Sequence, residues 1–178
     1  MDEFRRPQQR VNLQLPDIPG YKTLKCDFHM HTIFSDGLVW PGIRVQEAWQ
    51  EGLDAICITD HIEYQPHAME VPTNPNRSNE LAQAAAEQAN ILLIKGSEIT
   101  RGTPPGHFNA MFLQDSAPLV SDLNPEANKA AIDAAAAQNA FVFWNHPGWK
   151  ESKIEGSYAW IPFVDESRLV KESSHEAG

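Results

Sequence analysis

Short apolar runs recur along this chain, and histidine or acidic residues lie next to each run in the sequence. The runs hold four or so residues with no helical periodicity, which is typical of strands buried on both faces. Polar clusters that follow the carboxyl ends of parallel strands gather at one edge of a sheet. His107 is the exception, because it is expected to open its strand. The clusters are His29 with His31, Asp60 with His61, then Glu98, His107 and His146.

Helical stretches separate most of these runs. Helices are expected from Pro41 to Gly52, over 79–90 with Ser78 as the cap, and over 126–139 after Pro125. Strands are expected over 24–28, 55–58, 91–94, 107–113 and 141–144. The alternation of strands and helices predicts a parallel α/β architecture.

The ends of the chain differ from this pattern. Residues 1–20 are polar and rich in proline, so we expect an irregular N-terminal leader, with one domain over 21–178. A closed β/α barrel needs ~250 residues, whereas this chain has 178, and 150–178 show no clear strand–helix unit. The sequence therefore predicts a barrel that is truncated or diverged at its C-terminal end.

Composition limits the partners. The net charge of -10 argues against a nucleic-acid backbone, and no apolar run reaches the ~20 residues that span a bilayer. The N-terminus lacks an apolar signal-peptide region, so the sequence as written favours the cytoplasm, with a periplasmic location open if a signal peptide was removed. Cys26 and Cys57 are expected as buried core residues, and a disulfide between neighbouring strands is left open. No oligomeric state follows from the sequence.

The pair His29 and His31 points to a metal. Side chains two residues apart on a strand share a face, so both imidazoles converge while Met30 faces the other way. Imidazole is the commonest protein ligand for metals near neutral pH. Asp36 lies in a Ser-Asp-Gly sequence and is either a turn residue or a ligand. We therefore expect a cluster of metal ligands at the sheet edge.

Two further residues are candidates for work on the substrate. Asp60 either orients a neighbouring ligand or contacts substrate. Arg101 either clamps a phosphate, since a guanidinium matches two phosphoryl oxygens, or is a solvated loop residue. Both are taken as candidate catalytic residues.

Together these motifs resemble the PHP (polymerase and histidinol phosphatase) family over residues 24–149. The matching sequences are HMHT (29–32), SDG (35–37), ITDH (58–61), GSE (96–98), GH (106–107) and NHP (145–147). The resemblance implies a distorted (β/α)7-type barrel with up to three divalent metals at the strand ends. It implies a first metal on His29 and His31, Glu98 bridging the first and second, the second completed by His107 and His146, and the third on Asp36 and His61.

The resemblance also implies a phosphoric ester hydrolase whose multinuclear site delivers a metal-bound hydroxide to phosphorus. Imidazoles and carboxylates suit Zn, Mn or Fe. Residues 17–24, 59–67 and 143–149 look like a bacterial branch of the family that contains phosphodiesterases. The expected partner is a small phosphoester. The expected reaction is hydrolysis of a phosphodiester, with a histidinol-phosphatase-like monoesterase as the alternative.

One departure from the family pattern matters. The pattern ends in an Asp-x-His pair that completes the first and third metal sites, whereas this chain has Ser173 and His175 as its late candidates. A non-catalytic or truncated metal-binding module is therefore a second interpretation, and hydrolysis of a C–N bond a third.

Overall fold

The computed structural model describes residues 9–101, 106–120, 125–146 and 169–171. Ser173, His175 and the first eight residues of the expected leader lie outside these ranges. In chain order the elements are β1 (Cys26–Met30), α1 (Pro41–Gln50), β2 (Ala55–Ile58), α2 (Arg77–Ala89), β3 (Leu92–Ile99), β4 (Phe108–Met111), the 3₁₀ helix η1 (Ala117–Leu119), α3 (Pro125–Ala136), β5 (Phe141–Trp144) and β6 (Leu169–Lys171). This order confirms the predicted succession of strands and helices.

The six strands form one sheet in the order β1-β2-β3-β4-β5-β6, curled as an incomplete barrel. β1, β2 and β3 run parallel, and β6 runs parallel to β5. β4 is antiparallel to both β3 and β5, which corrects the expectation of a parallel succession. The link between Ile99 and Phe108 is too short for the crossover helix that a parallel pair needs. The amino end of β4 therefore meets the carboxyl ends of its neighbours.

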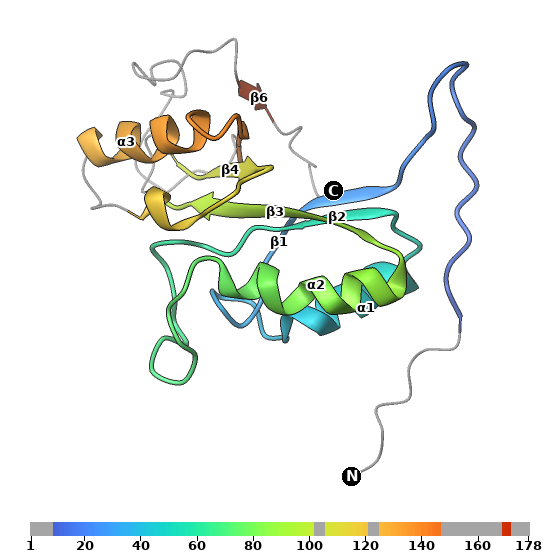
Figure 1. Ribbon diagram of the computed structural model, residues 1–178, viewed down its shortest axis with the longest axis horizontal. Helices are drawn as coiled ribbons and strands as arrows, with labels where there is room; N and C mark the ends of the chain where they lie inside the picture. Colours follow the sequence, from blue (N-terminus) through green and yellow to red (C-terminus); the bar gives the residue numbers. More distant parts are fainter. Residues whose placement is uncertain (1–8, 102–105, 121–124, 147–168, 172–178) are drawn as a thin grey trace.

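Alternating side chains divide the sheet into an outer and an inner face. Ile56 and Ile58 pack outward in the core beneath α1 and α2, while Cys57 packs inward with Met111. A second outer core lies beneath α3, which covers the end of the sheet away from α1 and α2 (Figure 1). The inner face thus carries both the small apolar cluster around Cys57 and Met111 and polar residues of β3 and β4 such as Glu98 and Asn109.

Some boundaries differ from the predictions. α2 begins at Arg77, and Ser78 is a buried residue of its first turn, not its cap. Asn76 occupies the cap position, but its side chain hydrogen-bonds Asp115 and the Ser116 amide instead. β3 continues to Ile99, so Glu98 lies inside a strand that was expected to end at residue 94.

The two cysteines have different environments. Cys57 is buried, as expected, and burial raises the pKa of its thiol. Cys26 is exposed, so the expectation of a core role is wrong for this residue, because β1 is an edge strand whose first residues lie outside the packed cores. Both thiols are free. Within the described ranges, the helices are too short or too polar to cross a membrane.

Candidate metal centre

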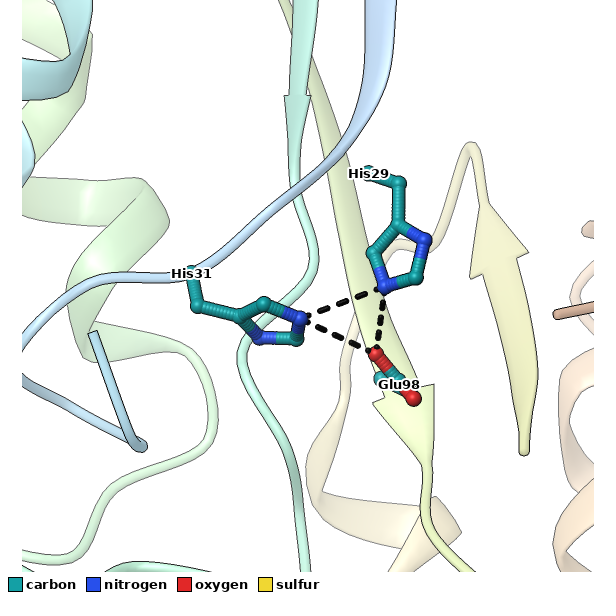
Figure 2. Close-up of side chains that lie close together, drawn as sticks. All are labelled: His29, His31 and Glu98. Carbon is teal, nitrogen blue, oxygen red and sulfur yellow. Dashed lines mark hydrogen bonds and ion pairs between the residues drawn. The ribbon is translucent and has the colours of Figure 1, made fainter. Parts of the chain in front are cut away.

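The two histidines of the first motif meet at one carboxylate oxygen. His29 Nε2 lies 2.8 Å and His31 Nε2 lies 3.2 Å from Glu98 Oε2, and the two nitrogens are 3.2 Å apart (Figure 2). Met30 packs on the opposite side with the α1–α2 core, as the alternation predicted. The pairing of β1 with β2 shifts register between Asp27 and Met30, and an irregularity of this kind re-aims side chains at a strand end.

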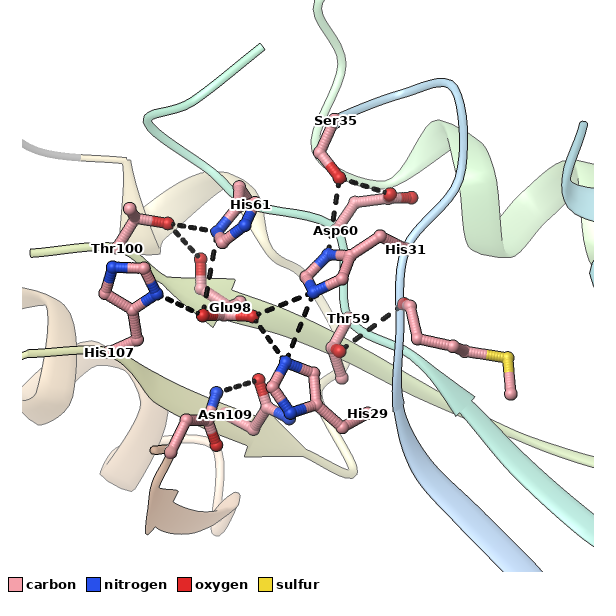
Figure 3. A network of polar contacts seen from close by, with 12 residues as sticks. His29, His31, Ser35, Thr59, Asp60, His61, Glu98, Thr100, His107 and Asn109 are labelled. Atoms are coloured by element: carbon pink, nitrogen blue, oxygen red, sulfur yellow. Dashed lines mark hydrogen bonds and ion pairs between the residues drawn. The ribbon is translucent and has the colours of Figure 1, made fainter. Parts of the chain in front are cut away.

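Glu98 lies at the centre of the cluster. Its side chain is fully buried on the inner face of β3, and His107 Nδ1 lies 2.6 Å from Oε1, on the opposite side of the carboxylate from His29 (Figure 3). Burial alone raises the pKa of this carboxyl. Hydrogen bonds from His107, His29 and His31 outweigh burial and hold the pKa well below its usual range. Glu98 is therefore an anion that faces imidazoles on both oxygens.

His61 and Asp36 form the outer part of the cluster. His61 Nε2 lies 3.6 Å from Asp36 Oδ2, and His31 Nδ1 lies 3.8 Å from Asp36 Oδ1. The His31 and His61 rings stack with centroids 4.5 Å apart. His61 Nδ1 is 2.7 Å from Thr100 Oγ1, which fixes the plane of the ring. The Asp36 carboxylate thus faces two imidazoles, as a ligand would.

His107 and His146 enter from the second half of the sheet. His107 precedes β4 and reaches the cluster because that strand is antiparallel. His146 follows β5, and its ring lies 5.0 Å from the His29 ring and 6.0 Å from the His107 ring, centroid to centroid. Its backbone has φ 49°, a left-handed conformation that costs a residue with a Cβ about 1–3 kcal/mol and is enriched at functional sites.

The donor atoms fit divalent cations. Nitrogen and oxygen ligands bound at about 2.0–2.2 Å to one cation stand roughly 3–4 Å apart, close to the separations of 2.8–3.8 Å between the facing donors. Among the described residues, three groups converge: His29, His31 and Glu98; His31, Asp36 and His61; and His61, Glu98 and His107. Six of the seven predicted ligands therefore belong to these groups, and His146 lies beside them through its ring contacts with His29 and His107. The groups differ from the expected pairs in joining His61, rather than His146, to Glu98 and His107.

Asp60 accepts hydrogen bonds from the segment that follows His31. Its carboxylate accepts hydrogen bonds from the Thr32 amide (2.6 Å), the Thr32 hydroxyl (2.7 Å) and the Ser35 hydroxyl (2.7 Å). The residue is 8% exposed. These contacts agree with the first alternative, that Asp60 orients a neighbouring ligand, and leave its contact with substrate a prediction.

The structure explains why glycine follows Asp36 in the Ser-Asp-Gly sequence. A Cβ at this position would lie 2.7 Å from the carbonyl carbon of His31 and from the backbone nitrogen of Thr32. Those are backbone atoms that cannot turn aside, so the turn carrying Asp36 passes too close to the His31–Thr32 peptide for any side chain. Glycine is required here for space rather than for a special φ.

Arg101 is buried beside Glu63. Its guanidinium pairs with the Glu63 carboxylate and donates to the Thr100 carbonyl at 2.6 Å, and the residue is 4% exposed. The described contacts therefore tie Arg101 to the loop after His61, and its contact with a phosphate stays a prediction. Glu63 also accepts a hydrogen bond from the Thr100 amide at 2.8 Å.

Several polar contacts of the site were not predicted. Thr100 meets His61, and Asn109 lies directly opposite Glu98 on the neighbouring strand. The signal for Thr100 was its spacing of two from Glu98, because the alternation of side chains continues one residue past the end of β3. Asn109 could be found only by knowing that β4 is antiparallel, because the register of the pair places it there.

Acidification is expected to destabilise the metal-free chain as the pH falls below about 6.5. Burial lowers the pKa of His61 from its usual 6.5, so between the folded and unfolded pKa values the unfolded chain binds more protons and stability rises with pH. Glu98, whose pKa is also lowered, adds a loss of the same sign below its usual 4.5. Urea unfolding with chelator measures the free energy of unfolding at pH 7.5, 6 and 5. In His61→Gln we expect this free energy to change less between pH 7.5 and 6. Equal stability at the three pH values would contradict the prediction.

The comparisons with known proteins agree with this geometry. The family described as the PHP domain matches residues 27–143. The chain is similar to a two-domain protein from Bacteroides vulgatus ATCC 8482 whose crystal structure is known and which contains a predicted PHP-like metal-dependent phosphoesterase. The two sequences are 54% identical, and the structures match with a TM-score of 0.81. The match covers 87% of this chain and 44% of the Bacteroides protein.

A more distant structure also matches. An amidohydrolase from Chromobacterium violaceum, with bound sulfate and no metal, is 22% identical with a TM-score of 0.42 over 53% of this chain and 30% of its own. No curated protein matches the chain. This chain thus spans less than half the length of the Bacteroides protein that it resembles.

Proposed function

The chain belongs to the PHP domain family, and we propose that it is a metal-dependent phosphoesterase that hydrolyses phosphodiesters. The observation that carries the proposal is the buried, ionised Glu98 with imidazoles facing both of its oxygens. A carboxylate in that position can bridge two cations. Divalent metals, when bound, supply a nucleophile at neutral pH and neutralise charge on phosphoryl oxygens.

We assign different roles in this reaction to different residues of the chain. We assign metal binding to His29, His31, Asp36, His61, Glu98, His107 and His146, with Zn, Mn or Fe as the fitting cations. Asp60 would hold the turn after His31 through Thr32 and Ser35. Arg101 would act through Glu63, which fixes Thr100 beside His61.

The relative supports the proposal at the level of chemistry. The Bacteroides vulgatus protein contains a predicted PHP-like metal-dependent phosphoesterase and shares 54% identity with this chain. Preference for a diester over a monoester rests on the local sequences around residues 59–67 and 143–149. The proposed substrate is a small phosphodiester.

A non-catalytic metal-binding module is the second candidate. The observation that favours it lies in the sequence, where Ser173 and His175 replace the late Asp-x-His pair of the family pattern. Two of the three proposed metals would then have one ligand fewer. Such a module would bind metal and turn over no substrate, so catalysis distinguishes the two candidates.

Hydrolysis of a chromogenic phosphodiester, beside its monoester, tests the proposal in the presence of Mn²⁺. We expect the diester to be cleaved faster and chelator to stop the reaction. We expect His146→Ala to lower the rate about 10- to 100-fold or more, since loss of a residue that only orients a metal ligand already costs about this much. His67→Ala is the matched control, because His67 is not one of the seven residues assigned to metal binding. A faster monoester would make the chain a phosphatase, and no turnover with bound metal would leave the non-catalytic module.

A further inference from the structure

Two buried asparagines connect distant parts of the site. Asn109 Nδ2 donates to the Phe28 carbonyl at 3.2 Å, and Asn145 Nδ2 donates to Asn109 Oδ1 at 2.8 Å. Asn109 is 0% and Asn145 1% exposed. Phe28 immediately precedes His29, and Asn145 immediately precedes His146. The two amides therefore join the backbone next to one proposed ligand to the backbone next to another.

The connection crosses the sheet interior rather than following its ladders. β2 and β3 lie between β1 and β4 in the sheet, so backbone pairing cannot hold Phe28 to Asn109. Asn109 instead projects from the inner face, opposite Glu98 in the β3–β4 register (Figure 3). It reaches the Phe28 carbonyl because the sheet curls. The backbone amide of Asn145 also donates to the His107 carbonyl at 2.8 Å, which ties β5 to the start of β4.

The hydrogen bonds of Asn109 and Asn145 lie where they can affect the proposed metal ligands. Asn109 contacts β1 within the stretch where the register between β1 and β2 shifts. The β1–β2 pairing therefore constrains the Phe28–His29 backbone less than it constrains the residues on either side. The part-buried hydrogen bond from Asn109 to the Phe28 carbonyl adds a constraint to this backbone, beside the bond that the His29 amide donates to Asp27 Oδ1 at 3.0 Å. Loss of it would let His29 move relative to Glu98 and His146.

We infer that Asn109, held by Asn145, is a positioning residue that fixes His29 against Glu98 and His146. The inference rests on the proposed metal centre and assigns these asparagines neither metal nor substrate contact. Partners that orient metal ligands in this way typically change metal affinity 10- to 100-fold when removed.

Binding of Co²⁺ tests the inference, because its visible absorption reports ligand geometry independently of turnover. We expect Asn109→Ala to weaken Co²⁺ binding about 10-fold or more and to alter the absorption spectrum, with a smaller change of the same kind in Asn145→Ser. Asn79→Ala is the matched control. Asn79 is also a buried asparagine that bonds two backbone carbonyls, those of Ile58 and Gly96, but it does so from α2.

The outcomes separate the inference from the proposed function. Absence of Co²⁺ binding by the unsubstituted chain would overturn the metal centre and the inference with it. An unchanged affinity and spectrum in folded Asn109→Ala, or the same change in Asn79→Ala, would overturn the inference alone. Failure of both Asn109→Ala and Asn145→Ser to fold, while Asn79→Ala folds, would make the pair a determinant of the fold and not of ligand geometry.

Discussion

Replacing Glu98 with glutamine is expected to remove bound metal and to lower phosphoester hydrolysis by about 100-fold or more. The carboxylate faces His29 and His31 through one oxygen and His107 through the other. Glutamine keeps the shape of the side chain but loses the negative charge and offers an N–H on one side, which cannot bind a cation. Loss of one preorganised group that stabilises the transition state typically costs about 10²- to 10³-fold.

Elemental analysis of the purified protein and the diester assay together measure this effect. Glu80→Gln is the matched control, because Glu80 is an exposed carboxylate of α2 that pairs with Arg77. We expect the control to bind metal and turn over substrate as the parent does. Full metal content in Glu98→Gln would show that the carboxylate is a structural anion for the histidines and would remove the basis of the bridging assignment.

Glu98 also shows what the sequence predicts well. Apolar runs followed by polar clusters were enough to place His29, His31, His61 and Glu98 at one end of a sheet, because strand periodicity and parallel packing follow from local patterns. The strand boundary was less accurate: β3 runs through Glu98 to Ile99, and its residues 95–98 give no apolar signal. The ligand position survives this error because alternation continues along the strand.

The contacts between distant segments could not be predicted in this way. The sequence marked His107 as an exception, but only the antiparallel direction of β4 explains why its first residues reach the site. The bond from Asn109 to the Phe28 carbonyl depends on the curl of the sheet across two intervening strands. For Arg101 the sequence left open a phosphate clamp and a solvated loop residue; the solvated alternative is wrong, because the fold of the loop after His61 places Glu63 to pair with the buried guanidinium.

Replacing Asp60 with alanine is expected to lower the free energy of unfolding by about 3 kcal/mol or more and to weaken metal binding. Asp60 accepts from the Thr32 amide, the Thr32 hydroxyl and the Ser35 hydroxyl. Each buried donor left without an acceptor costs about 1–3 kcal/mol. The same loss releases the turn between His31 and Asp36, so the effect on stability and the effect on the metal centre share one cause.

Asp60→Asn separates the geometry from the charge. Its Oδ1 can still accept from the Thr32 amide and the Ser35 hydroxyl, and the Thr32 hydroxyl can accept from its Nδ2. We therefore expect a loss of only about 1 kcal/mol and metal binding closer to that of the parent. Urea unfolding with and without Mn²⁺ measures both effects, with Asp133→Ala as the control because Asp133 is an exposed carboxylate of α3. If Asp60→Asn were as damaging as Asp60→Ala, the charge of Asp60, and not its three hydrogen bonds, would be what holds the His31 turn in place.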